Sequence, residues 1–384
     1  LHALRDGLTG PPLVKDVVDA SWVITESVVG QNDLTLTAEW TNGDEPLYFN
    51  RKFCGISYYA PAGWDLTVPM LSLATGTDPY QVSRTSVSEV GVFAVGNRAV
   101  SKPLRANAKI FLQGAYDAIT HNMYATLWLF QLIPKNSPYS DSTNFKSTIK
   151  NYWKYFALLG PGSESIDSLL LYADPPSSPN PKVVDWVLAH LHRTSDQAVV
   201  ATKAVFVKQD GQIVDTDGTG AFIDGINFEG VPEGNYYLSI RHRNHLGLRS
   251  QDILSLTSIL PPAYNLTDTT KIFKGANYTV DLVAAQLEPN SNIYGAYAGN
   301  VVPNRDIVYN NTDNDNAELL NILQGNKAGR KSGYLNADVN MNGTARYNGS
   351  ANDNAVMLSI VLKGNYAGRR RQPYLDVVIA NPPF

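Results

Sequence analysis

A tandem repeat in the last third of the chain constrains the fold most. The segments YAGNVVPNRDIVYNNTDNDNAELLNIL and LNADVNMNGTARYNGSANDNAVMLSIV align at one constant offset, which pairs Asp315 with Asp353. A further copy begins with GNYAGRRRQPYL, which repeats GNKAGRKSGYL. In each unit an Asn- and Asp-rich loop leads into an apolar segment with the spacing of a short capped helix. The pattern predicts a small α-containing repeat domain over residues 263–384, with repeats at about 294–325 and 334–364 and a C-terminal strand.

The loop of the second repeat begins like a calcium-binding loop. Asp338, Asn340 and Asn342 stand at alternate positions, and the glycine that follows permits the sharp turn of an EF-hand-type loop. The acid that would close the loop, Asp353, comes four residues later than in a regular loop. We expect calcium bound by these side chains and by the backbone carbonyl of Thr344, with the extra residues bulging outward. The alternative is an Asn-rich turn whose side chains satisfy its own backbone.

The first repeat departs from this pattern. Asn300, Val302 and Asn304 stand where the second repeat has its Asp-x-Asn-x-Asn run. The candidate ligands here are Asn300, Asn304, Asp306 and Asp315. Because the loop lacks the leading carboxylate, calcium is expected more strongly in the second repeat, and metal binding by the first stays open.

The preceding part of the chain favours antiparallel β structure. DLTLTAEW (33–40) alternates apolar and polar residues, as a half-buried strand does, and similar runs recur between Gly, Pro and Asn turns. KQDGQIVD (208–215) places an Asp-Gly pair between apolar runs, which predicts a hairpin. We therefore expect two antiparallel, immunoglobulin-like β-sandwich domains, at 1–103 and 104–262, the second with an insertion at about 117–180.

Composition excludes several classes of partner. The net charge is −4 and the sequence pI about 5.9, so no overall positive field would recruit nucleic acid or an anionic membrane. The longest apolar stretch, near MYATLWLFQLI, is well short of the roughly 20 residues that cross a bilayer, so no membrane insertion is expected. The basic run at 369–371 is expected in a solvated turn. The chain begins at Leu1 without a methionine, which is typical of a processed product or a fragment.

The cysteine and the histidines are expected to be structural. Cys54 is the sole cysteine, which excludes an internal disulfide, and its apolar neighbours predict a buried thiol. His190 and His192 alternate on a strand, and His242 and His245 lie in HRNH. Such pairs can bind a metal, but the flanking sequence offers no third ligand, so ordinary sheet residues are the favoured interpretation.

No catalytic pattern stands out. HExxH, G-x-S-x-G, Walker and G-x-G-x-x-G motifs are absent in a suitable context. Asp210, Asp215 and Asp217 gather at the predicted hairpin, where a role in the turn is favoured over acid or base catalysis. The chain is therefore not expected to be an enzyme.

An ordered set of segments carries a family resemblance. SWVITES, DLTLTAEW, AKIFLQGAYD, VVDWVLAHLHR, VATKAVFVKQDGQIVDTDG, YYLSIRHRNHLG and DVNMNGTARYNGSANDN span nearly the whole chain. In this order they resemble the C-terminal region of large secreted surface proteins exported by the type nine secretion system. The resemblance implies an extracellular location, β-sandwich modules and a terminal dockerin-like calcium element. It does not imply a catalytic activity. The tail LDVVIANPPF does not resemble a type nine sorting domain.

These features predict a secreted, non-enzymatic structural or adhesive protein of the bacterial cell surface. It would self-associate as a subunit of an extracellular filament or sheath, or bind other cell-surface proteins. The alternative is a carbohydrate- or protein-binding accessory module that tethers a larger adhesin or enzyme, with some of the 21 Tyr and 6 Trp stacking on glycans. The apolar run within residues 374–384 is expected to pair as a strand, within its own chain or with a neighbour.

Overall fold

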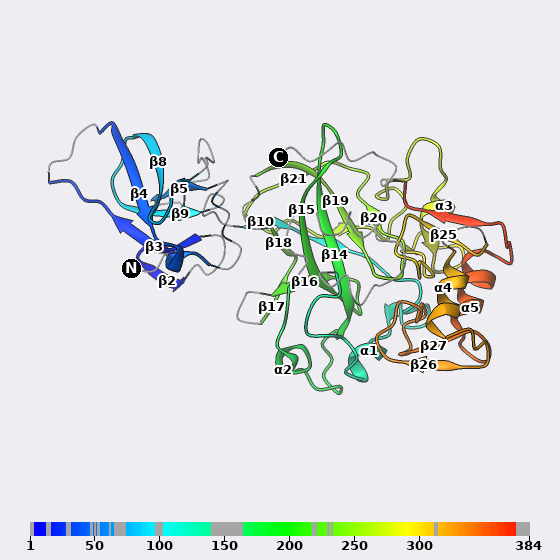
Figure 1. Cartoon of the computed structure of the whole chain (residues 1–384). Coiled ribbons are helices and arrows are strands. Elements are labelled where there is room, and N and C mark those ends of the chain that lie inside the picture. Colours follow the sequence, from blue (N-terminus) through cyan, green and yellow to red (C-terminus); the bar gives the residue numbers. More distant parts are fainter. Residues whose placement is uncertain are drawn as a thin grey trace. The chain divides into compact units, whose positions relative to one another are not determined.

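The fold is mainly β, with few and short helices (Figure 1). The computed structural model describes residues 4–12, 17–27, 32–46, 49, 51, 54–60, 63–64, 74–96, 103–139, 164–216, 221–228, 231, 233–310 and 314–373. The chain divides into two compact units. The first comprises Leu1–Leu104 with Glu229–Pro232, and the second Arg105–Phe228 with Glu233–Phe384. The first unit thus ends one residue after the predicted boundary at 103.

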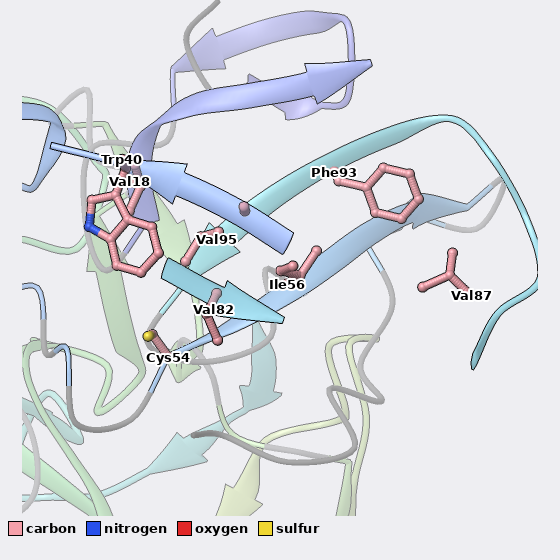
Figure 2. Packing of buried hydrophobic residues seen from close by; sticks show 9 residues of the cluster. Val18, Trp40, Cys54, Ile56, Val82, Val87, Phe93 and Val95 are labelled. Atoms are coloured by element: carbon pink, nitrogen blue, oxygen red, sulfur yellow. The ribbon is translucent and has the colours of Figure 1, made fainter. Parts of the chain in front are cut away.

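In the described residues, the first unit contains two antiparallel sheets that share one apolar core, and a separate two-stranded sheet of β1 and β2. One sheet has the order β3-β9-β5-β6 and the other β4-β8-β7. Figure 2 shows Val18, Ile56 and Phe93 from the first sheet gathered with Trp40 and Val82 from the second. The strands are β1 (Leu4–Asp6), β2 (Thr9–Pro12), β3 (Val17–Val23), β4 (Leu34–Trp40), β5 (Gly55–Ala60), β6 (Gly63–Trp64), β7 (Thr75–Gly76), β8 (Tyr80–Val87) and β9 (Val92–Gly96).

Strand β4 confirms the predicted half-buried strand. Its alternate residues from Leu34 to Trp40 are half-buried or buried, whereas Thr35, Thr37 and Glu39 are exposed. Since successive side chains of a strand point to opposite faces, the apolar half of this segment supplies one side of the core.

The second unit is built on a seven-stranded antiparallel sheet. Its order is β17-β16-β15-β14-β19-β20, and β21 also pairs with β19. Central strand β14 is buried along nearly its whole length, which fits its mainly apolar sequence, and Asp185, His190 and His192 are buried polar residues within it. The predicted hairpin is confirmed, because β15 pairs with β16. The strands are β14 (Val183–Arg193), β15 (Val199–Lys208), β16 (Ile213–Thr216), β17 (Phe222–Asp224), β19 (Gly234–Arg241), β20 (Leu248–Arg249) and β21 (Leu254–Leu256).

Two short helices lie in the predicted insertion. Helix α1 (Thr126–Leu129) and helix α2 (Ser168–Leu171) are joined by a hydrogen bond from Trp128 Nε1 to the Leu171 carbonyl. Residues 140–163 of the insertion lie outside the described residues. The remaining short elements are β10 (Leu104–Ala106), β11 (Ala108–Lys109), β12 (Tyr116–Asp117), β13 (Asn122–Met123), β18 (Ile226–Phe228), β22 (Tyr264–Asn265), α3 (Val280–Val283), β23 (Ala285–Gln286) and β24 (Tyr294–Gly295).

The tandem repeat forms two equivalent units that exchange strands. Strand β25 (Asp306–Val308) precedes helix α4 (Asp315–Ile322), and β26 (Arg330–Ser332) follows it. In the second repeat β27 (Thr344–Arg346) precedes α5 (Asp353–Ala355), which continues as a π-helix over Val356–Val361, and β28 (Arg369–Arg371) follows. Strand β25 pairs with β28, and β26 pairs with β27. The strand before each helix therefore pairs with the strand after the other helix.

Both repeats share one core. Leu319 of α4 and Met357 after α5 belong to the same buried apolar cluster. The equivalent residues Tyr309 and Tyr347 meet at their hydroxyl groups, 3.2 Å apart. The basic run predicted to be a solvated turn is instead β28. Asp306, on β25, lies within 4 Å of Arg369 and Arg371 and offsets part of the positive charge of β28.

The predicted boundary near residue 262 does not separate two compact units. Strand β11 pairs with β22 across it, and the hydrogen-bonded turn at residues 242–245 binds the repeat region. The predicted C-terminal strand within 374–384 lies outside the described residues. In the described part of the chain, no helix has the length and apolar character needed to span a membrane.

Candidate functional site

The two candidate acids of the second repeat are fully buried at the ends of its loop. Asp338 Oδ1 accepts the Asn342 N–H at 3.0 Å, and its Oδ2 accepts the Gly343 N–H at 2.8 Å. Asp353, at the start of α5, accepts the Val339 N–H at 2.8 Å and, through its other oxygen, the Arg346 N–H at 2.7 Å. Both carboxylates therefore close the loop onto itself.

The amide side chains of this loop bond locally. Asn340 Oδ1 accepts the Asn342 N–H, and Asn342 Oδ1 accepts the Thr344 N–H at 2.9 Å. Both amide nitrogens donate to the Ala351 carbonyl, Asn340 at 2.8 Å and Asn342 at 3.4 Å. These bonds are those of an Asn-rich turn, so the alternative to a calcium loop is compatible with the geometry.

The electrostatics of the loop favour a cation. Burial raises the pKa of Asp353 to about 8, and the charge of Asp338 adds to this effect. Burial also raises the pKa of Asp338, although the charge of Arg243 opposes it. Because a carboxylate has about four acceptor positions, the bonds already made leave lone pairs free on both acids.

The donor set therefore fits an oxygen-seeking ion such as calcium. Asp338 and Asp353 could hold it with the side-chain oxygens of Asn340 and Asn342 and the carbonyl of Thr344. Within the residues that the structure describes, no three His, Cys, Asp or Glu side chains gather as a metal cluster. A site here would thus depend on amide and carbonyl oxygens.

In the first repeat a single buried acid, Asp315, accepts backbone N–H groups of its loop in the same way. Asp315 Oδ1 accepts the Val302 N–H and its Oδ2 the Val308 N–H, both at 2.9 Å. The Val308 bond is equivalent to the bond between Asp353 and Arg346. Burial raises the pKa of Asp315 well above its usual range.

The other first-repeat candidates are engaged elsewhere. Asn300 bonds the backbone of Asn304 through both its amide oxygen and its amide nitrogen, and Asn304 Oδ1 accepts the Asp306 N–H at 2.7 Å. The Asp306 carboxylate lies near arginines, among them Arg371 at 3.6 Å. Among the residues that the structure describes, no second carboxylate lies beside Asp315, and this loop fits calcium less well.

A buried ionic network, which the sequence analysis missed, lies beside the second-repeat loop. Asp185 Oδ2 accepts hydrogen bonds from His242 Nε2 at 3.0 Å and Arg243 Nε at 2.9 Å, and its Oδ1 accepts one from the Tyr334 hydroxyl at 2.6 Å. Burial alone would raise the pKa of Asp185, but Arg243 and His242 lower it below its usual value. The available signal was a lone acid within the apolar strand VVDWVLAHLHR.

The network holds the start of the calcium-candidate loop. The Arg243 guanidinium donates to the Leu335 carbonyl, and Asn244 Nδ2 donates to the carbonyls of Asn336 at 3.0 Å and Asp338 at 2.7 Å. Burial lowers the pKa of His242, and Asp185 offsets part of this effect. His242 and His245 thus have structural roles, but they lie in a turn after β19 rather than within the sheet, and His242 has an acid partner that the flanking sequence did not reveal.

Of the hairpin acids, the structure confirms one turn role and corrects another. Asp210 Oδ1 accepts the Gln212 N–H at 3.1 Å, as a turn residue does. The prediction for Asp215 was wrong: this residue is buried on β16 and pairs with Lys203 Nζ at 2.8 Å. The reason is the register of the hairpin, which turns Asp215 inward. Asp217 lies outside the described residues.

Cys54 is buried, as predicted, and burial raises the pKa of its thiol to about 11. At neutral pH it is therefore a thiol rather than a nucleophilic thiolate.

Comparisons with known proteins add no support for a function of the loops or of the buried ionic network. No protein-family model, curated protein or solved structure matches the chain.

Proposed function

We propose that this chain is a secreted, non-enzymatic protein of the bacterial cell surface, with a structural or adhesive role as a subunit of an extracellular filament or sheath. The open edge of β4 carries the proposal. This seven-residue strand pairs with β8 on one side, and no described strand pairs with its other side. Such an edge presents N–H and C=O groups with which a strand of another chain can pair.

The sequence of β4 does little to block such pairing. It contains neither lysine nor proline, which natural proteins use to protect edges, and its outer face carries Thr35, Thr37 and Glu39. The resemblance to secreted surface proteins supports an extracellular setting. The shared core of the two sheets supports an immunoglobulin-like sandwich in the first unit, and the strand exchange between the repeats supports a dockerin-like domain.

Assembly can be tested by a charge placed on the edge. Negative-stain imaging of the purified chain should show filaments, and Thr35→Lys, exposed on β4, should convert them to monomers. The matched control is Gln81→Lys, because Gln81 lies on β8 between Glu39 of β4 and Thr75 of β7, where both sides of the strand are paired. A wild-type protein that stays monomeric at every salt and calcium concentration would contradict the proposal.

We also propose that the second-repeat loop binds calcium. The support is the burial of two carboxylates in one loop, with free lone pairs and raised pKa values for both acids. Bound calcium would neutralise both charges and fix the loop against the turn at residues 242–245. With only two carboxylates, we expect an affinity typical of extracellular modules, on the order of 10⁻⁴ to 10⁻³ M.

Exposed aromatic side chains favour a second candidate function, glycan binding. Tyr124, Phe130 and Tyr366 are each more than half exposed, and such rings can stack on sugars. Binding to a glycan array that is lost in Tyr366→Ala, with an unchanged melting temperature, would favour this function. Retention of glycan binding in variants of all three residues would exclude these rings as the platform.

A further inference from the structure

A lysine and an aspartate face each other inside the sheet of the second unit. Lys203 lies on β15 and Asp215 on the neighbouring antiparallel strand β16. Lys203 Nζ is 2.8 Å from Asp215 Oδ2, and the two side chains are only 17% and 3% exposed. Asp215 also accepts the N–H groups of Thr216 at 2.7 Å and Asn227 at 2.9 Å. These bonds fix the carboxyl carbon beside the amine.

A glutamate lies close to this pair. Glu164 Oε2 accepts the N–H of Ala204, the residue after Lys203, at 3.1 Å. Part of Glu164 reaches the surface, but its Oε1 is buried and has no hydrogen-bond partner within the described structure. Burial raises the pKa of Glu164, and the charges of Lys203 and Asp215 both act on it. The three groups therefore form one cluster, in which burial favours the protonated form of Glu164.

The surroundings of the cluster are apolar. Ala189 lies opposite Lys203 in the register of β14 and β15 and is fully buried. Ala201 and Val205, which share a face of β15 with Lys203, are also buried. Removing two opposite charges from water into such a site carries a desolvation cost, which a neutral product would relieve.

We propose that Lys203 and Asp215 form an intramolecular amide bond, with Glu164 as the group that transfers the proton. This inference goes beyond the proposed function and does not depend on it.

The reaction is a condensation. After proton transfer from the lysine ammonium to the aspartate, the amine nitrogen attacks Cγ of Asp215 and a new C–N bond forms. Glu164 gives its proton to the departing oxygen and receives one from the nitrogen, so it ends unchanged. The C–O bond breaks and one water molecule leaves. Ammonium and carboxylate become amide and water, with no oxidant or reductant.

Position and burial both favour this step. Holding the amine against the carboxyl group removes the entropic cost of bringing the reactants together. Exclusion of water then protects the product from hydrolysis. The bond would join β15 covalently to β16 in the middle of the sheet.

Mass spectrometry of the purified, folded full chain tests the proposal. The wild-type mass should be lower by one water than the mass of its sequence, and a digest should contain a branched peptide that joins Lys203 to Asp215. Lys203→Arg keeps the charge but should have the full mass, and Glu164→Gln should lose or greatly slow the reaction. Asp215→Asn should yield the same amide with loss of ammonia.

The chain contains a matched control pair. Lys271 Nζ is also 2.8 Å from a carboxylate oxygen, that of Asp252, but both side chains are nearly half exposed. These two residues should be recovered unmodified from the same digest. A wild-type chain of full mass, with Lys203 and Asp215 recovered free, would overturn the proposal even if a variant failed to fold. Full reaction in Glu164→Gln would overturn the assigned role of Glu164.

Discussion

A buried carboxylate needs partners, and single residues of the second unit meet this need in two ways. Asp185, Asp315, Asp338 and Asp353 are each at most 1% exposed. Asp185 bonds the side chains of Arg243 and His242, whereas the other three accept backbone N–H groups.

We expect Asp185→Ala to destabilise the protein by about 3–5 kcal/mol, because Arg243 would remain buried without its counter-charge. Urea unfolding would measure this, and the control Asp196→Ala, which removes an exposed partner of Arg193, should cost at most about 1 kcal/mol. Equal losses of unfolding free energy in Asp185→Ala and Asp196→Ala would show that the buried ionic network does not account for the destabilisation.

Calcium binding also depends on single residues. If the second loop binds calcium, thermal melts should show a stabilisation that a chelator removes, and Asp338→Ala should abolish that difference because it deletes one of two carboxylates. Asn300→Ala breaks local bonds to Asn304 and lowers stability somewhat, but it should leave the calcium-dependent difference intact. A difference that survives in Asp338→Ala would refute the ligand assignment.

Among the elements, the repeat helices depend on equivalent caps. Asn314 Oδ1 accepts the Ala317 N–H and Asn352 Oδ1 accepts the Ala355 N–H, both at 2.7 Å. Each Asn→Ala change should cost about 1 kcal/mol of unfolding free energy, since it leaves a helix N–H without its side-chain acceptor. The exposed Asn348, which caps no helix, provides the control. A similar loss in Asn348→Ala would assign the effect to the loop rather than to the caps.

Local patterns predicted the elements better than their pairing. The alternation in β4 and the Asp-Gly turn between β15 and β16 are local signals, and both were confirmed. The exchange of strands between the repeats joins segments far apart in the sequence, so periodicity could not reveal it. For the same reason the basic run of β28 was mistaken for a turn. At the candidate site, sequence spacing identified the buried acids of both loops, but not Asp185, whose partners His242 and Arg243 come from a distant strand end.

On the scale of the whole molecule, buried histidines couple folding to pH. His190, His192, His242 and His245 are all almost fully buried in the second unit. Burial lowers the pKa of His192 to about 4, and the charges of Arg249 and Arg241 contribute, whereas an unfolded histidine titrates near about 6.5. Between these values the unfolded state binds a proton that the folded state does not. The stabilisation is therefore complete above about pH 6.5 and is lost as the pH falls toward 4.

The contribution of His192 can be isolated by a difference between two proteins. Urea unfolding from about pH 7 to about pH 5 should show wild-type stability falling more steeply than that of His192→Gln, by up to about 1.4 kcal/mol per pH unit. Other titrating groups, including the loop acids, are present in both proteins and cancel in the comparison. Glutamine can still bond Ser239, the partner of His192 Nε2 at 2.8 Å, so the variant should fold. Parallel pH profiles for the two proteins would mean that His192 takes up its proton in the folded state, and that the sheet around it admits water.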